Sequence, residues 1–229
     1  LYASLLFIKN PRKNIITIED PVEYQIKGIN QIQVNPKVGL TFASGLRSIL
    51  RQDPDIIMVG EIRDSETADI AVHAALTGHF VLSTLHTNDA VSSVARLVDM
   101  GIEPFLIANS LEGIVAQRLV RKICNNCKKP YKPSQIEVLE LKLDPTREYT
   151  FYKGEGCDQC MNTGYKGRIG IYEVLEFDQD LKSLIVKTQD SNEILKMAVE
   201  KGFKTMFEDG VSKVLKGITT PQEILSVIK

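Results

Sequence analysis

The sequence predicts an α/β fold with a mostly parallel sheet and flanking helices, joined to a small cysteine-containing unit and a short helical C-terminal region. The first 120 residues alternate short apolar runs with segments of helical spacing, which is typical of parallel strands connected by helices. Two C-x-x-C pairs then interrupt this pattern. The chain has 229 residues, 43% of them hydrophobic and 25% charged, which suits one large or two modest globular domains.

The candidate strands of the sheet are three short apolar runs, at residues 15–18, 56–59 and 80–85. Helices are expected over residues 42–52, with Thr41 as N-cap, and over 88–98, with Gly101 ending the helix. A further helix, with Ser65 as N-cap, has a buried face of five apolar residues at helical spacing: Ala68, Ala71, Val72, Ala75 and Leu76. Residues 22–39 contain Gly28 and Asn35-Pro36, and they are expected to form a β-hairpin.

The remaining chain divides into two smaller parts. Residues 123–177 contain the four cysteines, several glycines and a candidate strand at 168–175. Residues 178–229 have the pattern of three short helices, the last with Thr220 as N-cap and Pro221 at its first position. We therefore expect three parts: a core over residues 1–122, a tetracysteine subdomain over 123–177 and a helical subdomain over 178–229.

Charge and hydropathy exclude several classes of protein. The net charge is −1, which favours neither nucleic acid nor anionic lipid as a general partner, and no nucleic-acid partner is expected. The apolar runs are much shorter than the roughly 18 residues of a membrane span. Leu1, Leu5 and Ile8 have helical spacing without a capping residue before them, so we expect the sequence to be part of a longer chain, cut inside a helix.

Polar side chains follow each of the three candidate strands. Glu19 and Asp20 follow the first, Glu61 the second, and Thr84 and His86 the third. Ligands of open α/β sheets bind beyond the carboxyl ends of the strands, so these side chains are expected to converge on one crevice. The alternative is that each acidic residue only caps the turn after its strand.

The segment 50–64, LRQDPDIIMVGEIRD, is the most informative in the chain. In a Walker B element, an aliphatic strand places a carboxylate beside the phosphates and the metal ion of a bound nucleotide. A carboxylate suits this position because magnesium prefers oxygen ligands. This segment resembles the signature of the type II secretion and type IV pilus assembly ATPases. Residues 16–23, ITIEDPVE, resemble the acidic box of that family, and residues 78–90, GHFVLSTLHTNDA, resemble its histidine box. The similarity extends over essentially the whole chain.

The resemblance implies a RecA-like domain that hydrolyses ATP within a homo-hexamer and drives subunit assembly at the bacterial inner membrane. It implies that Glu19 orients or deprotonates the attacking water and that Glu61 holds magnesium, directly or through water. His86 and His79 would sense the γ-phosphate. The further candidates for contact with the nucleotide or its phosphates are Asp20, Thr84, Arg47, Arg51 and Arg63, of which the arginines would steady transition-state charge.

For some of these residues a structural role is the alternative. Arg47 and Arg51 lie four apart on one helical face, which is also the pattern of a solvated or salt-bridged surface. His73 lies inside the alanine-rich helix and is expected to be a packed structural histidine. The resemblance also implies a cytoplasmic protein, peripheral to the inner membrane, that docks on a membrane platform protein and a cytoplasmic adaptor.

One motif of the family does not occur in these residues. The sequence contains no Gly-x-x-x-x-Gly-Lys-Ser/Thr loop, whose backbone amides and lysine hold the β- and γ-phosphates of ATP. Family members carry this loop immediately before a segment like residues 1–4. We therefore expect the 229 residues alone to bind ATP weakly or not at all, and a calorimetric titration that gives micromolar affinity would contradict this expectation.

The four cysteines form two pairs, Cys124 with Cys127 and Cys157 with Cys160, separated by 29 residues. Each pair can place two thiolates on one ion, and four thiolates satisfy tetrahedral zinc, so we expect a structural zinc site. Two disulfides, which a reducing cytoplasm disfavours, or a redox C-x-x-C site are the alternatives. Assembly ATPases of this group often carry such a motif whereas retraction ATPases generally lack it, so the cysteines favour assembly.

Two other classes of function are open. Basic residues cluster around the first cysteine pair, which would suit a zinc-containing nucleic-acid module, although the net charge of −1 argues against it. The same cluster could face anionic lipid, an acidic partner or solvent. The chain could also be a non-catalytic adaptor that only binds other proteins.

Overall fold

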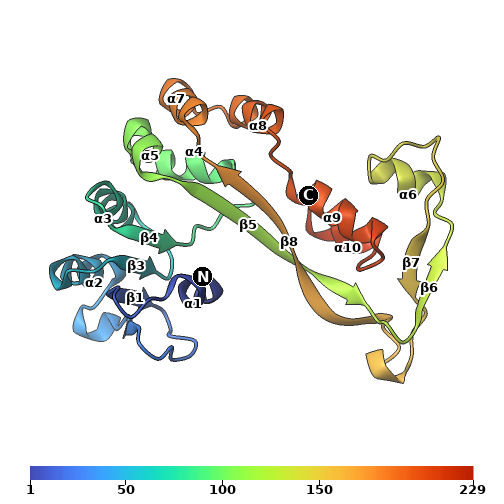
Figure 1. The fold of residues 1–229 in the computed structure, drawn as a ribbon, viewed down its shortest axis with the longest axis horizontal. Helices are drawn as coiled ribbons and strands as arrows, with labels where there is room; N and C mark the ends of the chain where they lie inside the picture. The colour runs from blue at the N-terminus through green and yellow to red at the C-terminus, as the bar shows by residue number, and fades with distance from the viewer. Residues whose placement is uncertain (229) are drawn as a thin grey trace. The chain divides into compact units, whose positions relative to one another are not determined.

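The computed structural model describes residues 1–228 and divides them into two compact units (Figure 1). The first unit comprises residues 1–113 and 176–197, and the second comprises residues 114–175 and the chain from 198 onward. The three-part division expected from the sequence stays a prediction. Among the described residues, no helix has both the length and the hydropathy needed to cross a membrane.

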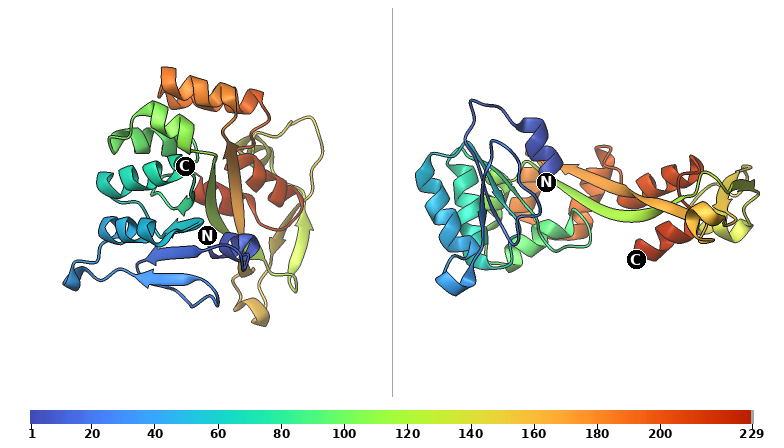
Figure 2. Two further views of the ribbon diagram at one scale, coloured as in Figure 1. Left: turned by 60° about the vertical axis from the view of Figure 1, so that its left-hand side comes forward. Right: turned by 90° about the horizontal axis from the view of Figure 1, so that it is seen from below.

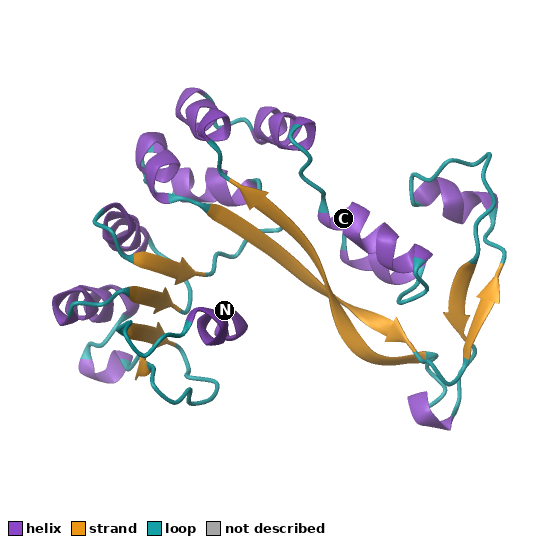
Figure 3. Cartoon of the chain, in the orientation of Figure 1, coloured by secondary structure: helices purple, strands orange, loops and turns teal. Residues whose placement is uncertain are grey.

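The first unit is built on a sheet of four parallel strands in the order β2-β1-β3-β4 (Figure 3). Ile15 pairs with Ile56 across β1 and β3, and Ile56 pairs in turn with Phe80 on β4. All residues of β1 and β3 are buried, which explains why these two strands appear in the sequence as continuous apolar runs. The bounds of the strands are β1 Ile15–Glu19, β2 Asn30–Gln33, β3 Ile56–Val59 and β4 Phe80–Ser83.

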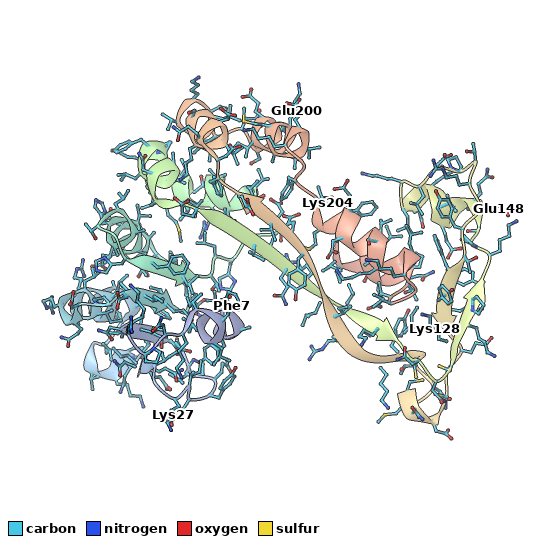
Figure 4. All side chains as sticks on the ribbon, in the orientation of Figure 1. Phe7, Lys27, Lys128, Glu148, Glu200 and Lys204 are labelled. Atoms are coloured by element: carbon cyan, nitrogen blue, oxygen red, sulfur yellow. The ribbon has the colours of Figure 1, made fainter. Side chains whose placement is uncertain are left out.

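Helices cover both faces of this sheet (Figures 1 and 2). Helix α1 (Tyr2–Ile8) lies on one face, where Leu5 packs into a buried cluster with Ile15 of β1. The same helix leaves Phe7, labelled in Figure 4, almost fully exposed. Helices α2 (Phe42–Ile49) and α3 (Ser65–Leu76) lie on the other face.

Two local sequence signals fix the position of α2. Thr41 is its N-cap, as expected, and exchanges hydrogen bonds with Ser44 in a capping box. Gly45 allows the helix to approach β1 closely, because a Cβ at this position would lie 2.1 Å from Cδ1 of Ile18. The helix is followed by a short 3₁₀ segment, η2 (Leu50–Gln52), which leads toward β3.

The structure corrects several expected helix boundaries in the first unit. The N-cap of α3 is Asp64 rather than Ser65, because its carboxylate accepts the N–H of Thr67 at 2.8 Å. The helix expected at 88–98 begins only at Ser92, whose N–H is capped by Asp89. The other helices in this part of the chain are α4 (Ser92–Asp99), α5 (Pro104–Ser110), α7 (Gln179–Lys187) and α8 (Ser191–Glu200).

The expected β-hairpin at residues 22–39 is wrong. Residues 30–33 form β2, which runs parallel to β1 and extends the sheet, with Ile16 opposite Asn30. The turn signal at Asn35-Pro36 produces a 3₁₀ segment, η1 (Pro36–Val38), closed by a single antiparallel bridge between Asn35 and Leu40. Turn residues show where the chain bends but not which strand the next segment pairs with, and here the free edge of β1 takes it.

The second unit contains two pairs of strands and a separate core. Strands β5 (Gly113–Ile123) and β8 (Tyr165–Glu176) run in opposite directions as a two-stranded sheet (Figure 3). Strands β6 (Lys128–Tyr131) and β7 (Phe151–Gly154) form a second, antiparallel pair. The core holds the buried side chains Val120, Leu141, Phe151, Ile171, Met206, Val211, Val214 and Ile224.

The described C-terminal residues form four helices rather than three. They are α7 and α8, given above, and α9 (Met206–Leu215) and α10 (Pro221–Val227). Thr220 caps α10 and Pro221 occupies its first turn, which confirms the expected start of the last helix. The second unit also contains α6 (Gln135–Glu140) and the 3₁₀ segment η3 (Asp158–Cys160).

Candidate functional site

The carboxyl edge of the parallel sheet carries the acidic and histidine residues predicted from the sequence. Glu19 is the last residue of β1, Glu61 lies two residues beyond β3, and His86 lies three residues beyond β4. Because all four strands are parallel, these side chains lie at one edge of the sheet.

Glu61 and His86 meet directly at this edge. Oε2 of Glu61 lies 2.9 Å from Nε2 of His86, and Oε1 of Glu61 lies 2.5 Å from Nη2 of Arg63. Burial opposes ionisation of Glu61, but the hydrogen bonds and charges of Arg63 and His86 outweigh it and lower the pKa of Glu61. His86 and Arg63 are largely exposed, with side-chain exposures of 79% and 59%, so both could reach a bound anion.

Thr84 connects the segments that follow β3 and β4, and Asp20, which follows β1, acts on this group through its charge. The hydroxyl of Thr84 donates to the carbonyl of Gly60 at 2.8 Å, and the carbonyl of Thr84 accepts the N–H of Ile62 at 2.9 Å. These two bonds hold the segment after β3 against the segment after β4. The ion pair with Glu61 and, more weakly, the charge of Asp20 raise the pKa of Arg63, so Asp20 acts on the group from the end of β1.

Glu19 is 3% exposed, and both of its carboxylate oxygens accept hydrogen bonds. Oε1 accepts from the hydroxyl of Thr17 and from Nε2 of Gln31, the latter at 3.1 Å, while Oε2 accepts from the hydroxyl of Tyr2. Burial and the contact with Glu19 raise the pKa of Tyr2 above its usual value. The carboxylate is therefore held by three neutral donors, from α1, β1 and β2.

Tyr2, Thr17 and Gln31 are the residues of this site that sequence reasoning missed. Tyr2 is separated from Glu19 by 17 residues, and Gln31 by 12. Only Thr17 carried a local signal, because residues i and i+2 of a strand project from the same face. The neighbours from α1 and β2 follow from helix packing and from the parallel pairing of β2, which the sequence did not reveal.

Three other candidates have partners elsewhere in the first unit. Arg47 pairs with Glu66 of α3 at 2.6 Å, and Arg51 donates to the hydroxyl of Ser48. His79 directly precedes β4, at the amino end of that strand, and its Nδ1 lies 2.9 Å from the carbonyl of Ala74. A contact between any of these residues and a nucleotide stays a prediction.

The expectation for His73 is wrong. The residue is not packed inside the protein, since its side chain is 57% exposed and pairs with Asp69 at 3.3 Å on the surface of α3. The buried alanine of that turn is Ala74, one position further along the helix. Of the apolar face predicted for this helix, Ala68, Ala71 and Val72 are buried, whereas Ala75 is only partly buried and Leu76 is exposed.

The second unit brings the four cysteines together. Cys124 follows β5, Cys127 precedes β6, Cys157 precedes η3, and Cys160 is the last residue of η3. All four sulfurs lie within 4.8 Å of one another. The sulfurs of three pairs, 124–157, 127–160 and 157–160, are separated by 3.8, 3.8 and 3.7 Å. With metal–sulfur bonds of about 2.3 Å, a tetrahedral site places neighbouring sulfurs about 3.8 Å apart, so the cluster has the dimensions of such a site.

The electrostatics of the cluster also favour a cation. Burial opposes the thiolate of Cys160, but backbone N–H groups of Cys157 and Gly164, at 3.2 and 3.3 Å, and the neighbouring thiols outweigh it and lower the pKa to about 6. Burial and the adjacent thiols raise the pKa of Cys127 to about 11. Four thiols this close cannot all ionise without a compensating positive charge, which a metal ion would supply.

Comparison with protein families gives one match over nearly the entire chain. The model of the family described as type II/IV secretion system protein matches residues 1–226. The chain is 52% identical over 229 residues to the type II secretion system protein E of Pseudomonas aeruginosa, which covers 100% of this chain and 45% of that protein. It is 54% identical over 227 residues to the type IV pilus assembly ATPase PilB of Thermus thermophilus, covering 98% of this chain and 26% of PilB.

A solved structure shares the fold. The crystal structure of the pilus retraction motor PilT with bound ADP superimposes with a TM-score of 0.71 and 29% sequence identity, over 99% of this chain and 56% of that chain. The chain thus spans less than half the length of the two curated relatives described above.

Proposed function

Because the chain belongs to the type II/IV secretion system protein family, and is a homologue of type II secretion and type IV pilus assembly ATPases, we propose that it contributes the catalytic carboxylates of such an ATPase. The observation that carries this proposal is the grouping of Glu61, Arg63 and His86 in direct contact at the edge of the sheet where Glu19 also lies. The motor would power assembly of a type II secretion pseudopilus or a type IV pilus.

The two carboxylates would divide the work according to their surroundings. Glu61 is a hard oxygen ligand at the end of a Walker B-like strand, and we propose that it holds magnesium, directly or through water. Glu19 has only neutral partners, which suits a carboxylate that orients or deprotonates the attacking water. His86 and Arg63 would contact the γ-phosphate and neutralise the charge that develops on it.

The cysteine cluster would hold a structural zinc ion. Cys124, Cys127, Cys157 and Cys160 provide four thiolates, which leave no open position for a catalytic water. The N–H groups that donate to Cys160 would orient this ligand and reduce the negative charge of the site. The ion would tie β5, β6 and η3 together.

The setting of the motor is also part of the proposal. We propose assembly as a homo-hexamer, docking on an inner-membrane platform protein and a cytoplasmic adaptor, and a cytoplasmic location at the membrane; membership of the family supports these proposals. The relative PilT was crystallised with ADP, which supports a nucleotide as the ligand of this fold.

Phosphate release by the full-length protein that contains these 229 residues tests the proposal. We expect Glu19→Gln and Glu61→Gln each to lower kcat by about 100-fold or more, because each removes a carboxylate from the reacting groups. Glu148→Gln is the matched control, since Glu148 lies in the second unit with an 89% exposed side chain. Unchanged phosphate release in both carboxylate variants would exclude the proposed site and favour a non-catalytic adaptor.

A further inference from the structure

Glu19 is surrounded by hydrogen-bond donors that the proposed function does not use. They come from three elements: Tyr2 of α1, Thr17 of β1 and Gln31 of β2. We propose that Tyr2 and Gln31 are positioning residues for ATP hydrolysis, which hold the carboxylate of Glu19 in one orientation and leave it a single acceptor position for the attacking water. This inference rests on the proposed role of Glu19.

The hydrogen bonds of Glu19 leave one acceptor position of its carboxylate open to a water molecule. A carboxylate offers about four lone-pair positions to donors. Oε1 of Glu19 accepts from Thr17 and Gln31, and Oε2 accepts from Tyr2. The described hydrogen bonds therefore occupy three positions and leave one on Oε2, beside the phenol of Tyr2. A water bound there would meet an oxygen whose direction is already fixed.

The hydroxyl of Tyr2 can only donate toward Glu19. Its oxygen already accepts the backbone N–H of Glu23 at 3.2 Å and Nε2 of Gln31 at 3.3 Å. A phenol has one O–H, and with both lone pairs engaged that proton is directed at the carboxylate. The ring is also held, because it packs edge-on against Tyr24 with the ring centroids 4.6 Å apart.

The amide of Gln31 is oriented in the same way. Its Oε1 accepts the backbone N–H of Ile26 at 2.6 Å, so its NH₂ group faces Glu19, Tyr2 and the backbone carbonyl of Tyr24. Neutral donors stabilise a buried carboxylate without neutralising it, unlike a lysine or arginine. Because the carboxylate is already held in one orientation, it loses little further conformational entropy when it binds the attacking water.

The contact between Tyr2 and Glu19 can be measured in the 229-residue chain without any enzymatic assay. With ¹³Cζ-labelled tyrosine, the NMR signal lost in Tyr2→Phe identifies Tyr2, and its pH titration reports the ionisation of the phenol. We expect Glu19→Gln to lower the pKa of Tyr2, because the variant removes the carboxylate that the ionised phenol would oppose. Burial of the ring is retained, so a shift reports the carboxylate. An unchanged titration would overturn the proposed contact and with it the inference.

Steady-state kinetics of the full-length protein test the positioning role. We expect Tyr2→Phe and Gln31→Leu to lower kcat by about 10- to 100-fold with KM for ATP within about twofold, because they misplace a group that acts on the water rather than on the nucleotide. Tyr24→Phe is the matched control: it removes a hydroxyl from the neighbouring ring, and the described hydrogen bonds of Glu19 do not include that hydroxyl. Activity of Tyr24→Phe should equal that of the unmodified protein.

The charge-changing variant Gln31→Glu gives a readout that misfolding cannot mimic. It places a second carboxyl group beside Glu19, and two carboxyl groups at this distance cannot both ionise easily. The rise of kcat with pH should therefore move to higher pH, with activity partly recovered in mildly alkaline buffer. A pH profile of unchanged shape would contradict the inference.

The same set of variants distinguishes failure of this inference from failure of the proposed function. If Glu19→Gln is inactive while Tyr2→Phe, Gln31→Leu and Tyr24→Phe all remain fully active, the positioning role is wrong and the proposed function stands. If Glu19→Gln itself retains full activity, the proposed role of Glu19 is wrong, and the inference is overturned with it.

Discussion

Two carboxylates at one edge of the sheet have opposite kinds of partner. Glu61 is flanked by Arg63 and His86, and their effect on its pKa exceeds that of burial. Glu19 is almost fully buried among a tyrosine, a threonine and a glutamine, all neutral. Only the first arrangement places next to the carboxylate side chains that can also bind phosphate. The division of labour proposed for the two residues follows from this difference.

Gly154 of the second unit lies where an added side chain should disturb the cysteine cluster. A Cβ on Gly154 would lie 2.0 Å from the carbonyl oxygen of Gly164, a backbone atom that cannot rotate away. Gly164 also donates its N–H to Sγ of Cys160. We expect Gly154→Ala to lower the free energy of unfolding by about 2 to 4 kcal/mol and to weaken metal binding, because the strands must separate at the ligand. Urea denaturation and competition with a chromogenic chelator would measure the two effects.

Gly170→Ala is the control for this substitution. Its Cβ would also meet atoms at short range, but they belong to the phenol of Tyr172, the far end of a flexible side chain that is 42% exposed. The free energy of unfolding should change by no more than about 1 kcal/mol. Equal effects of the two substitutions would show that the contact of Gly154 with Gly164 has no special importance.

Strand β5 and helix α10 are joined by an ion pair between Arg121 and Glu223. Nε and Nη2 of Arg121 donate to Oε1 of Glu223 at 3.0 and 2.6 Å, and the backbone N–H of Arg121 donates to Oε2 at 2.8 Å. The guanidinium also stacks on Tyr165 of β8, 4.2 Å from the ring centroid. Arg121 of β5 thus contacts both α10 and β8.

This pair predicts a pH dependence of stability. Burial opposes ionisation of Glu223, but the hydrogen bonds from Arg121 outweigh it, so the pKa of Glu223 is lower in the folded chain than the ordinary value of 4.5. A group with a depressed pKa stabilises the fold above its unfolded pKa and loses this effect as the pH falls through the folded value. We expect Glu223→Gln to cost about 2 kcal/mol at pH 7 and much less near pH 3, measured by urea denaturation.

The matched control is Glu148→Gln, which removes the ion pair of Glu148 with Lys132. Both side chains of this pair are largely exposed, so its loss should change stability by less than about 0.5 kcal/mol at either pH. If Glu223→Gln were as silent at pH 7 as the control, the contact between β5 and α10 would not contribute to stability.

The molecule consists of two units, each with its own buried cluster. The parallel sheet, with Leu5, Ile15, Ile56 and Met58 at one face, belongs to the first unit, and the cysteine cluster belongs to the second. Strands β6 and β7 are short, and the sulfurs lie where these strands meet β5 and η3. A metal ion would therefore support one unit and not the other.

Metal removal should consequently act on the second unit alone. Treatment with a strong chelator is expected to expose the amides of β6, β7 and η3 to hydrogen exchange, because metal binding supplies on the order of 10 kcal/mol of folding free energy in such sites. The amides of β1 and β3 should keep their protection. Hydrogen exchange followed by mass spectrometry measures both regions in one experiment.

The control for chelation is a variant with all four cysteines changed to serine. It should reproduce the exchange pattern of the chelated protein and show no further response to chelator. Reduced, folded protein without bound metal, or equal loss of protection in both units, would contradict a structural metal site.

Much of the fold followed from local patterns. Continuous apolar runs predicted β1 and β3 because both faces of these strands are covered, and Thr41 and Thr220 marked true helix starts. Long strand β5 was not predicted, although its alternating exposure has the period of a strand. The signal was obscured because the exposed face carries the apolar residues Val115 and Leu119, whereas the other face carries the basic residues Arg118 and Lys122.

Sequence alone established the motifs of the family, the acidic and histidine residues that follow the strands, and the spacing of the cysteines. Tertiary structure decided that β2 joins the sheet in parallel, that His73 lies on the surface, and that Tyr2 and Gln31 hold Glu19. The reason is physical: residue periodicity records the local alternation of buried and exposed positions. The partners of a buried carboxylate come from segments that are distant along the chain, and only their packing brings these segments together.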